Sequence, residues 1–190
     1  MENNDKNLIL KKKQEAYSLF KNYDFLKAIK LLNKIIIEDD FKDSACFFLL
    51  GTSYLHEKNL ELAENNLKIS MELNNKFYDT VHNLGVVNQL KSNYSEAINF
   101  YYKALELNPK SLGTLNQLAE CYEKSKSFEN AKKYYNKTLE IDKDNKVAFK
   151  GLARIYLKFG YHKQGLEYVQ KSSGLLRFTE KEFKIITWKD

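Results

Sequence analysis

Proline and glycine are scarce in this sequence. One proline and seven glycines occur among 190 residues. Proteins built of many short strands need more turn residues than this, so the scarcity favours helices. The sequence also lacks an uncharged apolar run of about 18 residues, and its first five residues are polar rather than basic and then apolar. We therefore expect neither a membrane span nor a signal peptide, and we predict a cytoplasmic protein.

Cysteine and arginine are also rare. Cys46 and Cys121 are far apart and form no CxxC motif, which argues against a disulfide framework or a zinc ribbon and favours two buried thiols. Arg154 and Arg177 are the only arginines, although the formal net charge is +6. Nucleic-acid readers rely on bidentate arginine, so the charge is poor evidence for nucleic-acid binding. It suits an acidic segment in a protein partner better.

A repeat of about 34 residues runs through the chain. Ala28, Ala63, Ala97 and Ala131 are 35, 34 and 34 residues apart, and one more step of 34 reaches Gly165. A second series of small residues follows the same period at the eighth position of each repeat: Ala16, Gly51, Gly85, Ala119 and Ala153. Small residues let two helices approach closely, so this spacing predicts a stack of helical hairpins.

Large apolar residues accompany the small ones at fixed positions. In the third repeat the series is Val81, Leu84, Gly85, Ala97, Tyr101 and Pro109. This series resembles the tetratricopeptide-repeat (TPR) motif, W-x2-L-G-x2-Y followed by A-x3-F and P. The resemblance implies an all-α fold, a right-handed superhelical solenoid of five helix-turn-helix hairpins forming a single domain over residues 1–190. The five repeats are expected at residues 9–42, 44–77, 78–111, 112–145 and 146–179.

The ends of the predicted hairpins carry recognisable signals. The sixteenth position of the first four repeats holds residues that favour helix N-caps: Asp24, Asn59, Asn93 and Ser127. After the fifth repeat, Thr179 and Glu182 have the spacing of a capping box. We predict a short capping helix over residues 180–188, within a terminal cap of residues 180–190. The alternative is the start of a sixth repeat.

The sequence contains no recognisable catalytic motif. GxSxG, P-loop, dinucleotide-binding and HExxH patterns are all missing. His56 and His82 fall on neighbouring predicted helices, but no third metal ligand is placed beside them. We therefore predict no enzyme activity, no cofactor and no metal.

The resemblance implies a binding groove on the concave side, lined by the first helix of each hairpin. The residues expected there are Lys13, Tyr17, Phe48, Thr52, His56, His82, Val86, Asn116, Glu120, Lys150, Arg154 and Lys158. The predicted function is a protein–protein interaction scaffold or adaptor that holds a peptide or protein segment. The alternative is an accessory, substrate-recruiting subunit of a separate enzyme such as a transferase or hydroxylase.

Two known binding modes of the family do not fit these residues. The carboxylate clamp of chaperone-binding arrays needs asparagine where this chain has Tyr17 and Leu49. The asparagine ladder of another array type is matched only by Asn83. In the fifth repeat, Lys146, Lys150, Arg154 and Lys158 recur every four residues and form one basic row. The row is either a solvated surface or the contact for an acidic partner segment.

Overall fold

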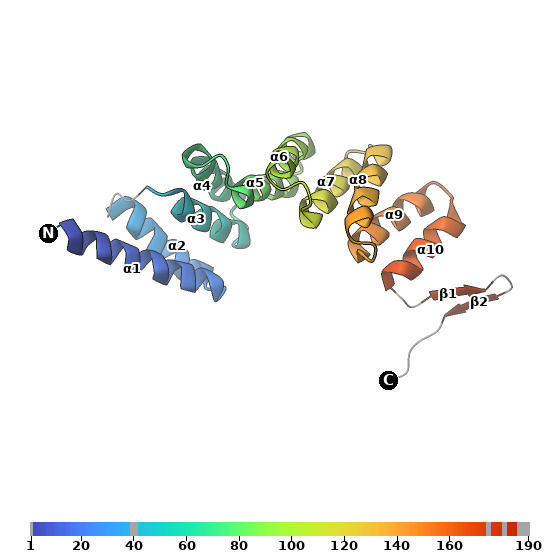
Figure 1. The fold of residues 1–190 in the computed structure, drawn as a ribbon, viewed down its shortest axis with the longest axis horizontal. Coiled ribbons are helices and arrows are strands. Elements are labelled where there is room, and N and C mark those ends of the chain that lie inside the picture. The colour runs from blue at the N-terminus through green and yellow to red at the C-terminus, as the bar shows by residue number, and fades with distance from the viewer. Residues whose placement is uncertain (1, 39–41, 174–175, 180–181, 186–190) are drawn as a thin grey trace. The chain divides into compact units, whose positions relative to one another are not determined.

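The computed structural model describes residues 2–38, 42–173, 176–179 and 182–185, and its helices follow one another as antiparallel hairpins (Figure 1). Within these ranges there are ten α-helices. They are α1 (Glu2–Lys21), α2 (Phe25–Asn33), α3 (Ser44–His56), α4 (Leu60–Leu73), α5 (Tyr78–Leu90), α6 (Tyr94–Leu107), α7 (Leu112–Lys124), α8 (Phe128–Ile141), α9 (Lys146–Lys158) and α10 (His162–Ser173). Each predicted repeat holds one odd-numbered helix, its A helix, and the next helix, its B helix. The five predicted hairpins are confirmed.

The chain divides into two compact units, each described by itself below. The first unit, residues 1–107, contains α1 to α6, and the second unit, residues 108–190, contains α7 to α10. In the first unit a π-helical segment, η1 (Lys34–Glu38), extends α2.

Small residues occupy the centre of every hairpin. The alanines that define the repeat have no exposed surface at Ala28, Ala63, Ala97 and Ala131. At the eighth position, a side chain added to Gly51 would overlap Leu67, and one added to Gly85 would overlap the ring of Tyr101. The predicted close approach of the paired helices is therefore confirmed, both at the alanines that define the repeat and at the glycines of the eighth position.

The turn between the two helices of each hairpin contains a left-handed residue. The fifteenth position has φ between 61° and 63° at Tyr23, Lys58, Ser92 and Lys126, and φ 79° at Gly160. After this residue the chain returns to the preceding helix, as when Asn59 N–H donates to the Tyr54 carbonyl at 2.9 Å. Such a bond satisfies a carbonyl at the helix end, which explains why the conformation recurs even without glycine.

Side chains cap several helices at their N-termini. Asp24 and Asn59 cap α2 and α4 as predicted, accepting from the backbone N–H of Lys27 and Leu62. Ser127 precedes α8, but its hydroxyl accepts from the side chain of Asn130 instead. Three A helices have side-chain caps of their own: Asp43 caps α3, Ser111 caps α7 and Asn145 caps α9.

The predicted terminal helix is wrong. Residues 182–185 of the predicted 180–188 helix form strand β2 (Glu182–Ile185), which pairs antiparallel with β1 (Leu176–Thr179). Thr179 and Glu182 therefore lie opposite each other across two strands rather than in a capping box. Apolar residues alternate with polar ones along both strands, a period of two that suits a strand and not a helix. The rest of the predicted cap, residues 180–181 and 186–190, lies outside the described residues.

Candidate functional site

The A helices of the first unit share one surface, here called the first A-face. On α1, residues spaced three and four apart project along one side of the helix, and α3 and the start of α5 contribute the opposite wall. Together they enclose a pocket of about 510 Å³. It is lined by Leu10, Lys13, Gln14, Tyr17, Ala45, Phe48, Leu49 and Phe77.

The walls of this pocket are mostly apolar. Phe48 and Phe77 pack with their ring centroids 4.7 Å apart. Leu10 and Tyr17 keep 56% and 52% of their surface exposed, so the pocket is rimmed by apolar surface that the described residues leave uncovered. Such a concave apolar site is typical of a place where a ligand or partner side chain is buried.

Lysines flank the pocket along α1. Lys13 is ion-paired with Asp43, which also caps α3 by accepting from Ala45 N–H at 3.0 Å. The Lys21 ammonium lies 5.9 Å from the centre of the Tyr17 ring. Lys13, Tyr17 and Lys21 are four residues apart and form one row on the helix.

The other predicted residues of the first unit lie elsewhere. Thr52 is buried, and its hydroxyl accepts from the Asn83 amide at 3.0 Å between α3 and α5. His56 stacks on Phe25 at 4.2 Å, beside the start of α2. Val86 on α5 is half-buried.

His82 is packed among aromatic rings. It stacks on Tyr78 with centroids 5.7 Å apart and lies 5.6 Å from the ring of Tyr101. Burial lowers the pKa of His82, against the opposing influence of Asp79. Among the described residues, no group of three or more His, Cys, Asp or Glu could hold a metal ion.

In the second unit, α7 and α9 form a separate surface, the second A-face. It holds a smaller pocket of about 270 Å³, lined by Gly113, Asn116, Gln117, Glu120, Tyr135, Val147 and Arg154. Three of these residues, Asn116, Glu120 and Arg154, were predicted from the sequence. The pocket is more polar than that of the first unit, because it contains two amides, a carboxylate and a guanidinium.

A polar network joins three helices behind this pocket. Arg154 donates to both carboxylate oxygens of Glu123, from Nε at 3.0 Å and from Nη2 at 2.8 Å. The Tyr135 hydroxyl donates to the same carboxylate at 3.1 Å. The bond to Glu123 raises the pKa of Arg154, and burial raises the pKa of Tyr135. Arg154 is thus held in place and stays charged.

Asn116 has a fixed amide orientation. Asn145 Oδ1 accepts from Ala148 N–H at 3.0 Å, and Asn145 Nδ2 donates to Asp142 at 3.0 Å, so Asn145 itself is oriented. Asn116 must then present Nδ2 to Asn145 Oδ1, at 3.1 Å. Its own Oδ1 is buried without a partner among the described residues.

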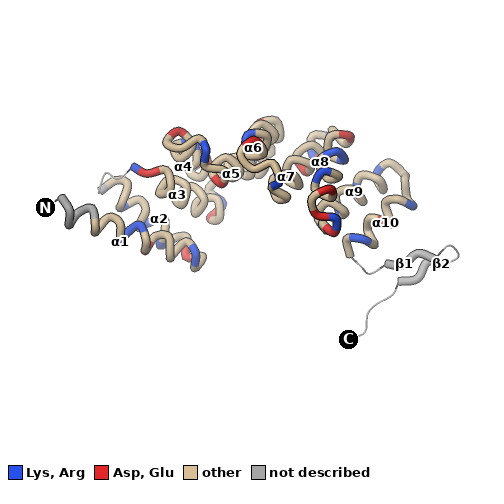
Figure 2. Tube along the Cα trace, in the orientation of Figure 1, with Lys and Arg blue, Asp and Glu red and all other residues tan. Residues whose placement is uncertain are grey.

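The predicted basic row of α9 is divided, because two of its four residues have partners of their own. Arg154 pairs with Glu123, and the Lys158 ammonium lies 4.3 Å from the centre of the Phe128 ring. Lys146 and Lys150 are exposed. Acidic and basic residues are interspersed on the helices as a whole (Figure 2). The row is therefore not a uniform band of unpaired cations.

The comparison with known families matches residues 79–144 to the tetratricopeptide repeat. This matched part of the chain consists of tetratricopeptide repeats. The match covers α5 to α8 almost completely, and the hairpins on either side keep the same positions of small residues. No curated protein gives a significant match to this chain.

Several solved structures share the fold of this chain. A crystal structure of MamA is 21% identical, with a TM-score of 0.76, and the match covers 83% of this chain and 91% of that one. Another MamA crystal structure is 20% identical, with a TM-score of 0.77 and coverage of 86% and 89%. MamA from residue 41 onward, from Desulfovibrio magneticus RS-1, is 13% identical, with a TM-score of 0.81 and coverage of 88% and 94%. At these identities the likeness concerns the fold.

Some pocket residues of the chain were missed from the sequence. Leu10 and Ala45 occupy the second position of their repeats, and Gln14 and Leu49 the sixth. The helical spacing around Lys13 and Tyr17 was the available signal, since residues three or four apart share a face. The contact between Glu123 and Tyr135 had a weaker signal in the sequence. The corresponding positions of the third repeat hold Gln89 and Tyr101, whose side chains form the equivalent hydrogen bond at 2.7 Å.

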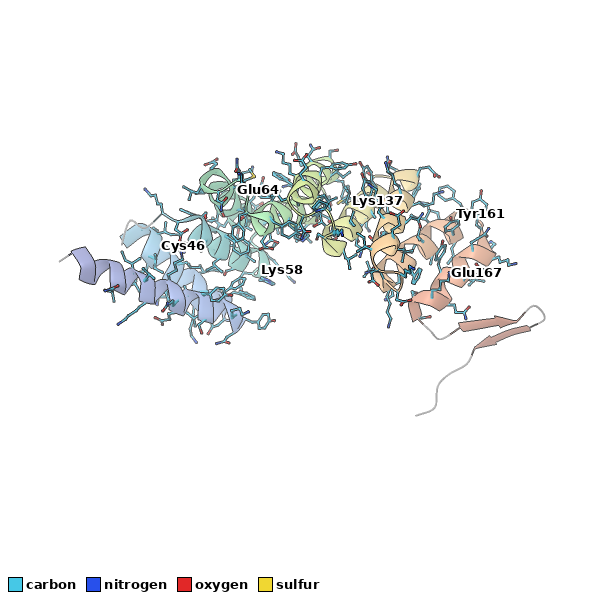
Figure 3. The ribbon with its side chains drawn as sticks, in the orientation of Figure 1. Cys46, Lys58, Glu64, Lys137, Tyr161 and Glu167 are labelled. Atoms are coloured by element: carbon cyan, nitrogen blue, oxygen red, sulfur yellow. The ribbon has the colours of Figure 1, made fainter. Side chains whose placement is uncertain are left out.

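None of the described helices is long and apolar enough to cross a membrane. Both cysteines are buried free thiols (Cys46 is labelled in Figure 3). Burial raises the pKa of Cys46 to about 11 and that of Cys121 to about 12. Both thiols are therefore protonated near neutral pH and are poor nucleophiles.

Proposed function

We propose that this chain is a non-catalytic scaffold that binds a peptide or protein segment along its A-faces. The observation that carries the proposal is the position of the pockets: each opens among A helices, where the repeats leave apolar or polar side chains exposed. Repeat arrays create surfaces of this kind, on which a partner segment can be held.

The contents of the two pockets support a binding role over catalysis. The first pocket offers apolar contact area, which stabilises a complex by removing that area from water. The second offers hydrogen-bonding groups held by the Glu123–Arg154 pair. Several of the predicted residues are exposed and available to a partner segment: Tyr17, His56, Lys150, Arg154 and Lys158.

A cytoplasmic location belongs to the same proposal. Two buried free thiols are compatible with a reducing compartment. Fractionation of host cells, with the chain detected by an antibody, should place it with cytoplasmic markers. Recovery with extracellular or envelope fractions would contradict this location.

The function can be tested by affinity capture with matched baits. The baits would be the wild-type chain, Tyr17→Ala on the first A-face, and Tyr102→Ala on α6, where an exposed tyrosine lies on a B helix. We expect at least one host protein to be retained by the wild type and Tyr102→Ala and lost with Tyr17→Ala, as measured by quantitative mass spectrometry.

The pattern of recovery decides between the alternatives. If one enzyme is recovered in stoichiometric amount, the chain is an accessory subunit that recruits substrate. If all three baits retain the same proteins equally, the A-face around Tyr17 is not the binding surface and the proposal fails there.

A further inference from the structure

The pocket of the first A-face has the size of a binding site for a whole side chain. Its volume of about 510 Å³ lies in the range of ligand pockets, about 300–1,000 Å³. Phe48 and Phe77 form a packed aromatic pair in its wall, while Leu10 and Tyr17 remain largely exposed at its rim. An aromatic or large aliphatic side chain would cover both exposed residues at once.

Lysines of α1 lie in and next to the lining of this pocket. Lys13 is the only charged residue in its lining, and Lys21 lies beyond Tyr17 on the same row of α1. The carboxylate of Asp43 is ion-paired with Lys13 of this row and is also engaged as the cap of α3. A second carboxylate, supplied by a ligand near Tyr17, would meet Lys21 at the exposed end of the row.

We infer that this pocket binds one large apolar side chain of a partner segment that carries a carboxylate directly beside it. The apolar group enters between α1 and α3, and the carboxylate lies over the Lys13–Tyr17–Lys21 row. This inference rests on the proposed function, since it names the chemistry of the segment that the first A-face takes.

Short synthetic peptides test the chemistry directly. Three ten-residue peptides share identical Ser/Gly flanks and differ in the centre, which is Glu-Phe-Glu, Lys-Phe-Lys or Glu-Ala-Glu. Their binding to the full chain is measured by nuclear magnetic resonance titration. We expect the Glu-Phe-Glu peptide to bind at least about fivefold more tightly than Lys-Phe-Lys at low salt, and this ratio to fall below about twofold at 1 M salt, where charges are screened. Glu-Ala-Glu should show no saturable shifts.

Variants locate the bound side chain. Ala45→Phe fills the pocket from α3, and Gln14→Trp fills it from α1, so either should abolish binding of Glu-Phe-Glu. Tyr102→Ala, on the B-helix side of the same unit, is the control and should leave binding unchanged. Lys21→Glu should remove the preference for Glu-Phe-Glu over Lys-Phe-Lys. Circular dichroism of each variant separates loss of binding from loss of fold.

Three outcomes would overturn the inference. Equal binding of Glu-Phe-Glu and Glu-Ala-Glu would mean that no apolar anchor is recognised. Unchanged binding to both folded filling variants would place the peptide elsewhere. Self-association of the wild type that disappears in Ala45→Phe would make a second copy of the chain the occupant. If host partners are captured through the A-face but are indifferent to the filling variants, the proposed function stands and only this inference fails.

Discussion

The ring of Tyr135 occupies the space that a side chain at residue 151 would need. A Cβ added to Gly151 would overlap this ring, and one added to Gly85 would overlap Tyr101 in the first unit. Both tyrosines occupy the same position of their repeats and are fully or almost fully buried. At each of these two positions the helices approach so closely that glycine is required. The tyrosine ring opposite is held by its packing and cannot easily move away from an added Cβ.

Gly151→Ala should therefore destabilise the fold. We expect a loss of about 1–3 kcal/mol, the usual cost of forcing extra atoms into a packed core. The matched control is Gly113→Ala, also in an A helix of the second unit, where an added Cβ would meet nothing within 4 Å. The control should be stabilised by up to about 1 kcal/mol, because alanine favours a helix over glycine. Urea unfolding of both variants measures the difference, and equal midpoints would contradict the packing described for Tyr135.

At the scale of elements, Glu64 links α4 to the end of α5. Its carboxylate receives Lys68 at 2.6 Å and Lys91 at 2.8 Å (Glu64 is labelled in Figure 3). The hydrogen bonds from these lysines lower the pKa of Glu64. A carboxylate with a lower pKa in the folded state contributes stability above its unfolded pKa, and that stability is lost as the pH falls through the lowered value.

Glu64→Gln should thus be less stable than the wild type at pH 7, by about 1 kcal/mol or less for an ion pair near the surface. The difference should shrink as the pH falls through the lowered pKa of Glu64, where the wild-type carboxylate becomes protonated. Glu72→Gln, an exposed residue on the same helix, serves as the control and should show little effect at either pH. Urea unfolding at several pH values gives both curves. A difference that grows on acidification would have the wrong sign for this pair.

The Glu123–Arg154 ion pair links α7 to α9, as the Glu64–Lys91 pair links α4 to the end of α5. Its bidentate geometry makes it stronger than a single surface contact, although Arg154 is 55% exposed at its side chain. A double-mutant cycle of Glu123→Ala and Arg154→Ala should show a coupling free energy of about 1 kcal/mol at low salt, and less at 1 M salt. Lys150→Ala, one turn away on α9, should change stability by no more than about 0.5 kcal/mol. Additive single effects would show that the pair contributes nothing.

The hairpins could be predicted from the sequence because the small residues that each one requires lie within one repeat and recur in the next. Small residues every 34 positions leave few alternatives to closely paired helices. The terminal strands were missed because the Thr179 and Glu182 spacing satisfies a capping box and a cross-strand pair equally well. The alternation along residues 176–179 and 182–185 was visible, but two short strands give a weak signal next to five strong repeats.

The candidate site was predicted in part. Lys13, Tyr17 and Phe48 line the first pocket because their repeat positions determine the direction in which they project. Thr52 has an equivalent position but is covered by Asn83, and the sequence does not reveal a side-chain contact 31 residues away. The same holds for His56, whose stacking on Phe25 depends on how neighbouring hairpins pack.

At the scale of the whole molecule, the stability of a repeat array is approximately the sum of its repeats and their nearest-neighbour contacts. That the five repeats act as one domain stays a prediction. It is tested by whether the two units, residues 1–107 and 108–190, unfold together. Each hairpin turn belongs to a single repeat, so a substitution in a turn should alter the contribution of that repeat alone to the stability of the array.

The left-handed turn residues allow such a change. Lys58 (labelled in Figure 3) and Lys126 have φ 61° and 63° and are exposed, one in each unit. Replacement by glycine removes the steric cost of this conformation, at the expense of greater freedom in the unfolded chain. We expect Lys58→Gly and Lys126→Gly each to raise stability by up to about 1 kcal/mol, with additive effects in the double variant. Gly160→Ala should lower it. Urea unfolding measures all four chains, and a loss of stability in both glycine variants would contradict the strain argument.

The recurrence of this turn has a consequence for how long the protein survives proteolysis. Proteases act on the unfolded fraction, which changes several-fold with about 1–2 kcal/mol of stability. None of the five left-handed residues lines either pocket. Substitutions at the turns can therefore lengthen or shorten the survival of the chain while the residues that line the two pockets stay the same.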